Sequence, residues 1–240
     1  MLTEIGSLVL RVYILRSLWT ALYAQNAGPP GLPLHSMITY ATVAMLMSLI
    51  LEVDGTRLIR EKIREGTIAT DLMKPISVPL YFFSDGAGQT LLHAILVIPS
   101  LLCALLLVRI DVPSPATLLA FFAAFVVGYG VNFFLNFLMN CIAFWTLETF
   151  AAQLIVRWVS DLLSGQIIPL ALFPGIFGRI VFALPFAAIY STPLLIYVGA
   201  IPPERWAASI AVQCAWLVLF AALASIVWRA ASQRVVIQGG

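Results

Sequence analysis

Residues 91–108 read LLHAILVIPSLLCALLLV, an apolar run that only His93, Pro99 and Ser100 interrupt. A transmembrane helix needs about 20 predominantly apolar residues, whereas a transmembrane β-strand alternates apolar and polar residues. The run does not alternate. It therefore predicts a membrane-spanning helix and excludes a barrel strand.

The composition of the whole chain also indicates a membrane protein. Its 240 residues are 62% hydrophobic and 10% charged, and the mean hydropathy is +1.01. A soluble domain contains about 45–50% apolar and about 25% charged residues. The chain has too few charges to cover a water-facing surface, so we expect an all-α integral membrane protein whose main solvent is the lipid bilayer.

Apolar runs predict six transmembrane helices in a single domain over residues 1–240. They lie at residues 2–24, 36–53, 86–108, 117–145, 151–172 and 206–228. Arg11 and Arg16 interrupt the first run, whose first turns could instead lie along the membrane surface. Several prolines and glycines interrupt residues 164–199. Because proline breaks a continuous helix, we expect short re-entrant helices there.

The distribution of basic residues predicts the orientation of the chain. Seven basic residues fall on one side of the predicted membrane: Arg57, Arg60, Lys62, Arg64, Lys74, Arg229 and Arg234. Three fall on the other side: Arg109, Arg179 and Arg205. This bias places both termini and the loop between spans two and three in the cytoplasm. Residues 164–199 then face outward.

The loop between spans two and three, residues 54–77, is the most polar part of the chain. With the preceding residues it reads EVDGTRLIREKIREGTIATDLMKPIS from residue 52, with five basic and five acidic residues. Ile59 and Ile63 share one face of a predicted amphipathic helix, which Gly66 is positioned to end. Thr67 is positioned to cap a second short helix, which Pro75 stops. The loop either only connects two spans or forms a docking surface, and we favour docking.

Three stretches resemble type-2 ABC-transporter permeases. Residues 61–77 (EKIREGTIATDLMKPIS) are similar to the coupling segment of that family, and residues 164–186 (SGQIIPLALFPGIFGRIVFALPF) to its broken segment after the fifth span. Residues 143–150 (AFWTLETF) and the Trp-Arg pair at 228–229 fit a six-span subfamily of drug or viologen exporters. The short N-terminus departs from the family, whose members often begin with an interfacial elbow helix.

The resemblance implies a permease of an ATP-driven exporter in the bacterial inner membrane. It implies two ATPase subunits that carry ATP and Mg²⁺, a second identical or homologous permease, and a hydrophobic or cationic drug-like substrate. The chain has no G-x-x-x-x-G-K-[ST] phosphate loop of its own, so we expect a non-catalytic subunit with no cofactor. The residues that would couple to the ATPase are Arg60, Glu61, Arg64, Glu65, Gly66, Thr67, Ile68, Leu72 and Met73.

Two groups of polar residues fall inside predicted spans. Asn132, Asn136 and Asn140 repeat every four residues and therefore form one stripe on the fourth span. Arg157 and Asp161 lie one turn apart in the fifth span, where charges are costly unless they pair or face water. The asparagines either join helices or line a substrate path. Arg157 and Asp161 either form an ion pair that fixes helix packing, or form a gate or a recognition site for a charged substrate. Asp85, Gln89 and His93 repeat the same spacing before and within the third span.

Other classes of protein fit the sequence less well. A stand-alone channel or secondary transporter remains the alternative, although the two halves of the chain show no convincing repeat. An enzyme or a metal site would need clustered His, Asp, Glu or Cys residues, and the sequence offers two histidines and scattered carboxylates. The net charge of +2 is too small to suggest nucleic-acid binding.

Overall fold

The computed structural model confirms the all-α prediction. It describes residues 2–26, 28, 31–51, 56–73, 77–108, 110, 112–146 and 150–233, without the side chains of 2–9, 57, 64, 100, 103–108 and 150. Within these residues every regular element is helical: α1 (Leu2–Ala24), α2 (Leu34–Leu51), α3 (Arg57–Arg64), α4 (Ile68–Leu72), α5 (Val78–Val108), α6 (Pro115–Cys141), η1 (Ile142–Phe144), α7 (Phe150–Leu163), η2 (Leu170–Leu172), α8 (Gly175–Ala183), α9 (Ser191–Tyr197) and α10 (Pro203–Ser232).

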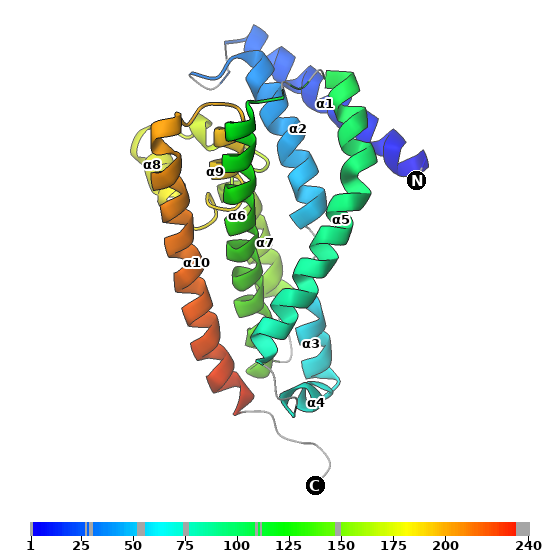
Figure 1. The fold of residues 1–240 in the computed structure, drawn as a ribbon, viewed down its shortest axis with the longest axis vertical. Coiled ribbons are helices and arrows are strands. Elements are labelled where there is room, and N and C mark those ends of the chain that lie inside the picture. The colour runs from blue at the N-terminus through cyan, green and yellow to red at the C-terminus, as the bar shows by residue number, and fades with distance from the viewer. Residues whose placement is uncertain are drawn as a thin grey trace.

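Three segments of the described chain are long and apolar enough to cross a membrane. They are α2, α6 together with η1, and α10. The long helices α5, α6 and α10 extend over most of the molecule, and α3 continues the direction of α2 towards one end (Figure 1). The count of six spans stays a prediction.

Helix α6 lies at the centre of the fold and packs against α10, α9, α3 and α7. Its start is set locally, because the Ser114 hydroxyl accepts a hydrogen bond from the Thr117 backbone N–H at 3.2 Å and Pro115 occupies the first turn. Small residues allow its neighbours to approach closely. A methyl group on Gly130 would lie 2.7 Å from the Leu217 side chain of α10. The close approach of α6 and α10 therefore requires glycine at position 130.

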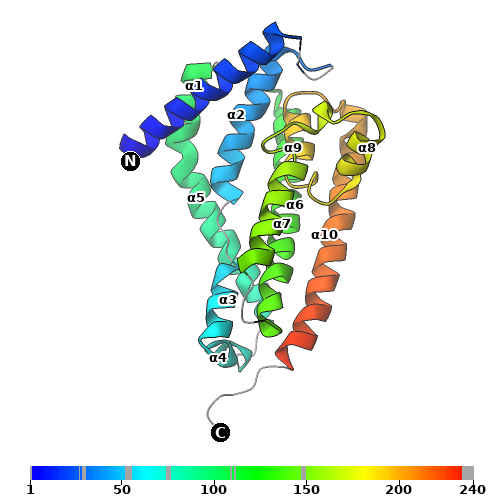
Figure 2. The ribbon, with the colours of Figure 1, turned by 180° about the vertical axis from the view of Figure 1, so that it is seen from behind.

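The two ends of the molecule carry different elements. Helices α3 and α4 lie at one end with the last turns of α10, and α8 and α9 lie at the other (Figures 1 and 2). Helix α1 crosses α2 and α5 obliquely in the half that holds α8 and α9. Its buried Val12 and Trp19 belong to the main hydrophobic core. The end of α10 therefore lies on the α3 side, as the orientation prediction requires, whereas α1 begins in the other half.

Two helices have bounds that differ clearly from the predicted spans. Helix α5 begins at Val78 rather than at residue 86, because Asp85 does not interrupt it: the Asp85 carboxylate accepts a hydrogen bond from the Gln89 amide one turn later, at 2.9 Å. Helix α7 ends at Leu163 rather than at residue 172, since Gly165 has a φ of +84° that a helix cannot accommodate. At about 1.5 Å per residue, α7 alone is too short to span a bilayer core of about 30 Å.

The other helices stay close to the predicted bounds. The expected spans 36–53, 117–145 and 206–228 correspond to α2, to α6 with η1, and to α10, while α1 has the bounds that the sequence predicted. Residues 52 and 53, at the end of the second expected span, lie outside the described residues. The interrupted segment 164–199 contains only the short helices η2, α8 and α9.

Candidate transport cavity and coupling helices

Helices α3 and α4 are held on the membrane-spanning helices by their apolar side chains. Ile59 of α3 is fully buried and Ile68 of α4 is 2% exposed. Both belong to a cluster with Phe82 of α5, Phe137 of α6 and Trp228 of α10. Burying an isoleucine contributes about 1.5–3 kcal/mol. The pair α3–α4 is therefore packed against the rest of the fold.

The turn between α3 and α4 depends on Gly66. Its φ of +74° lies in the left-handed region, and its N–H donates to the Ile63 carbonyl at 3.2 Å, so it ends α3 as predicted. The expected side-chain cap by Thr67 is wrong: Thr67 occupies the N-cap position immediately before α4, but its hydroxyl makes no capping bond and donates back to the Lys62 carbonyl at 3.5 Å. Pro75 lies outside the described residues.

The residues expected to couple to an ATPase divide into two groups. Glu65, Gly66, Thr67 and Met73 are exposed at the tip of the pair, and Met73 is 85% exposed. We call these four residues the coupling tip. Ile68 is buried, while Arg60, Glu61 and Leu72 are half-buried. The side chain of Arg64 lies outside the described side chains.

An ion pair that the sequence analysis missed joins the two helices. Lys62 Nζ of α3 lies 2.5 Å from Asp71 Oδ2 of α4 and 5.6 Å from the centroid of the Phe82 ring. The Asp71 side chain is 3% exposed. A buried carboxylate is stable only with a partner, so this pair fixes α4 against α3. The two residues meet across the Gly66 turn, and no helical spacing indicates the contact.

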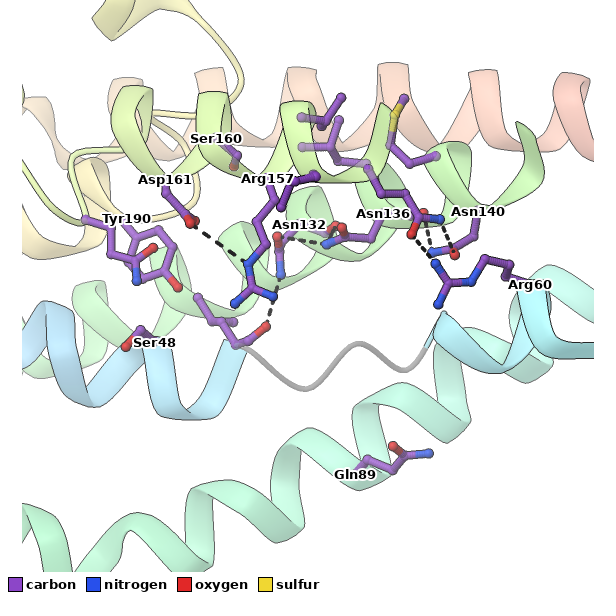
Figure 3. A pocket seen from close by; sticks show the side chains of 17 residues that line it. Ser48, Arg60, Gln89, Asn132, Asn136, Asn140, Arg157, Ser160, Asp161 and Tyr190 are labelled. Carbon is purple, nitrogen blue, oxygen red and sulfur yellow. Dashed lines mark hydrogen bonds and ion pairs between the residues drawn. The ribbon is translucent and has the colours of Figure 1, made fainter. Parts of the chain in front are cut away.

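A cavity of about 740 Å³ lies between α2, α3, α5, α6 and α7 (Figure 3). All five residues expected along a substrate path line it: Asn132, Asn136, Asn140, Arg157 and Asp161. Six primary amides line the cavity in all: Gln89, Asn132, Asn136, Asn140, Gln153 and Gln166. Arg60, which the resemblance assigned to ATPase coupling, lines it as well. The cavity is therefore rich in hydrogen-bonding groups.

The asparagine stripe of α6 bonds along the helix and to α2. Asn136 Nδ2 donates to the Asn132 side-chain oxygen at 3.1 Å and to the Asn132 carbonyl at 3.0 Å. Asn132 Nδ2 donates to the Leu51 carbonyl at the end of α2, at 3.4 Å. The stripe therefore joins α6 to α2, as one of the two interpretations predicted, and it also lines the cavity. Its place in a substrate path stays a prediction.

Four side chains form a continuous set of hydrogen bonds at the α3 end of the cavity. Asn140 Nδ2 of α6 donates to Thr56 Oγ1 at 2.7 Å. Gln153 Nε2 of α7 donates to Asn140 Oδ1 at 2.9 Å, and Arg60 Nη1 donates to Gln153 Oε1 at 2.5 Å. Thr56 immediately precedes α3 and Arg60 belongs to α3. The three hydrogen bonds and the backbone of α3 therefore form a closed ring. We call Thr56, Arg60, Asn140 and Gln153 the polar ring.

The position of Gln153 in the sequence indicates that it shares a helix face with Arg157 and Asp161, although it was not predicted as a site residue. Gln153, Arg157 and Asp161 repeat every four residues, the same spacing as the asparagine stripe, and all three line the cavity. Arg157 Nε lies 4.0 Å from Asp161 Oδ2, with side chains 62% and 29% exposed. In Figure 3 this pair lies between the polar ring and Tyr190. At this exposure the pair orients the two groups and adds little stability.

Comparison with known proteins identifies the family. A family model described as ABC-2 family transporter protein matches residues 9–239. The chain belongs to the ABC-2 transporter family. No curated protein and no solved structure matches it. Membership makes the chain the membrane component of an ABC transporter and implies an ATPase partner.

At the other end of the cavity, three side chains of the permease donate hydrogen bonds to backbone carbonyls. Tyr40 Oη of α2 donates to the Gly165 carbonyl at 2.8 Å, and Ser191 Oγ of α9 donates to the Ser164 carbonyl at 2.8 Å. Gln213 Nε2 of α10 donates to the Ala188 carbonyl at 2.6 Å. These bonds fix the segment that carries Gln166 and Tyr190 to the cavity.

Proposed function

We propose that this permease is the membrane-spanning subunit of an ATP-driven exporter. In this proposal the coupling tip docks on a separate ATPase, and the cavity forms part of the substrate path. One observation carries it: the element that exposes the coupling tip also contributes to the polar ring that lines the cavity. Movement of α3 would therefore change the hydrogen bonds of α6 and α7.

The proposal extends to the arrangement in the membrane. We place spans at α2, α5, α6, α7 with the segment that follows it, and α10, in one permease domain in a bacterial inner membrane. Helix α1, the first of the six predicted spans, begins in the half that holds α8 and α9 and crosses α2 and α5 obliquely, so we do not count it among the spans. The coupling tip faces the cytoplasm, since the basic residues concentrate on that side, and α8 and α9 face outward. Two ATPase subunits that bind ATP and Mg²⁺, and a second permease, complete the transporter.

The cavity lining bears on the substrate. The resemblance implied a hydrophobic or cationic drug-like molecule. Among the described residues that line the cavity, Asp161 is the single carboxylate, and it faces the Arg157 guanidinium. The lining itself favours neither a hydrophobic molecule nor a cation, and that substrate stays a prediction of the resemblance.

Charge reversal at the coupling tip tests the proposed docking. The full chain, with an affinity tag, is purified from its native membrane together with any ATPase that carries a phosphate loop. We expect Glu65→Lys to reduce the copurified ATPase by about tenfold, because it reverses a charge at the docking surface. A tenfold loss of affinity corresponds to about 1.4 kcal/mol. Glu204→Lys is the matched control, since Glu204 is also exposed but lies in the first turn of α10. Equal ATPase recovery with both variants would reject docking at this tip.

A backbone change at Gly66 tests coupling separately from docking. Proline fixes φ near −65° and has no N–H, so Gly66→Pro removes both the +74° conformation and the bond to Ile63. We expect ATP hydrolysis without transport in reconstituted vesicles, with normal membrane insertion. Gly66→Ala keeps the N–H and meets no atom within 4 Å, so at a backbone cost of about 1–2 kcal/mol for the positive φ it should retain most of the transport. Unchanged transport by Gly66→Pro would overturn the role of the turn.

A further inference from the structure

The cavity lining points to a substrate class. We infer that the cavity binds a hydroxyl-rich polar group, such as a sugar ring, rather than a lipophilic cation. The inference rests on the proposed function in taking the cavity as a substrate path. Its volume of about 740 Å³ falls within the range of about 300–1,000 Å³ that small-molecule sites occupy.

The charged groups of the described lining are engaged with one another or with amides. Arg157 faces Asp161, and Arg60 donates to Gln153. Sites for organic cations use aromatic faces or unmatched carboxylates. Tyr190 is the single aromatic residue in the described lining. A cation would therefore have to displace an arginine to reach a carboxylate.

Several amide groups of the lining, in contrast, keep hydrogen-bonding capacity that the described residues do not use. The side-chain oxygen of Asn136 and the whole side-chain amide of Gln166 have no hydrogen-bond partner among the described residues. Gln89 uses its nitrogen for Asp85 and keeps its oxygen available. Figure 3 shows Gln89 on α5, across the cavity from the asparagine stripe. A ligand between the two walls meets the acceptor oxygens of Gln89 and Asn136 on opposite sides, and it meets both a donor and an acceptor at Gln166.

Hydroxyl groups match this lining because each both donates and accepts, as an amide does. Burying an apolar ligand against the amides would leave polar groups unsatisfied, at about 1–3 kcal/mol for each. The same hydroxyls can come from a free sugar or from the headgroup of a glycolipid. The chemistry of recognition is shared, and the source is decided by experiment.

The test measures binding to the full chain in phosphatidylcholine nanodiscs without an ATPase. Three probes are compared: free maltotriose, a glucosyl diacylglycerol incorporated in the disc, and tetraphenylphosphonium. We expect one of the two sugar probes to bind, and Gln166→Leu to weaken binding at least tenfold. Binding of maltotriose indicates a free sugar, and binding of the glycolipid alone indicates a headgroup. His93→Leu is the control, because His93 is exposed on the same helix as Gln89 and does not line the cavity.

Two variants keep the test decisive. Gln166→Leu removes no hydrogen bond of the described side chains, so its folding is not at risk from a lost contact. Asn136→Leu should weaken the same probe, and its folding is checked by size-exclusion profile. Failure of both sugars to bind, sugar binding that neither variant changes, or tetraphenylphosphonium binding that Asp161→Asn abolishes would each overturn the inference. Because no ATPase is present, these results are independent of whether the coupling tip docks.

Discussion

The two ends of the cavity are stabilised by different kinds of contact. At the α3 end, the side chains of the polar ring bond to one another across three helices. At the opposite end, Tyr40, Ser191 and Gln213 bond to backbone carbonyls, and glycines permit backbone contact. Side chains can exchange partners with small rotations, whereas backbone contacts fix a segment in place. The difference suggests that the α3 end is movable and that the opposite end is rigid; the proposed function places this opposite end outward, and we call it the outer end.

The largest effect is expected at Gly165, where the outer end is tightest. A methyl group there would lie 2.1 Å from Ser191 Oγ and 2.9 Å from Tyr40 Oη, at a φ of +84°. Left-handed backbone costs about 1–2 kcal/mol for a non-glycine residue, and overpacking adds about 1–3 kcal/mol. Gly165→Ala should therefore lower the free energy of unfolding by about 2–5 kcal/mol, measured by thermal unfolding in detergent.

The control for this prediction is Gly175→Ala. Gly175 also has a positive φ, +55°, but no atom lies within 4 Å of the added methyl group. This variant should show the backbone cost alone, about 1–2 kcal/mol. Equal destabilisation by the two variants would mean that the contacts with Tyr40 and Ser191 do not tighten the outer end.

A smaller effect is expected where α6 meets the segment before α9. A methyl group on Gly128 would lie 2.9 Å from the Ala188 carbonyl oxygen and 3.0 Å from that of Ile189. Because these atoms are backbone, they cannot rotate away, and Gly128→Ala should cost about 1–3 kcal/mol of unfolding free energy. Gly88→Ala is the control, a helical glycine with open space around it, and should gain about 0.5–1 kcal/mol. Similar melting temperatures for the two variants would contradict a close-packed outer end.

Sequence periodicity predicted the cavity better than it predicted the helix ends. The four-residue spacing of Asn132, Asn136 and Asn140 places them on one face whatever their partners are, and they line the cavity together. Helix ends depend on local bonds that hydropathy does not include. Asp85 stays inside α5 because Gln89 pairs with it, and the φ of Gly165 ends α7 early.

Contacts between distant segments could not be predicted from spacing. Tyr190 immediately precedes α9 and reaches the cavity because α9 packs against α2 and α6. Lys62 meets Asp71 only across a turn. Gln153 is different, because its spacing from Arg157 was visible in the sequence. Gln153 was not predicted, because it is uncharged and the prediction considered only the charged residues Arg157 and Asp161 of this apolar run.

The smallest effect on stability is expected in the polar ring. A side-chain hydrogen bond inside a membrane protein contributes about 0.6 kcal/mol on average, and the bonds of Gln153 within the polar ring go to Arg60 and to Asn140. Gln153→Met should therefore lower the free energy of unfolding by only about 1 kcal/mol, while hydrogen–deuterium exchange of α3 rises because that helix loses its connection to α7. Gln233→Met, at the exposed end of α10, should change neither measurement. If Gln153→Met destabilised the permease as much as Gly165→Ala, the α3 end would be as rigid as the outer end, and movement of α3 could not be the step that ATP drives.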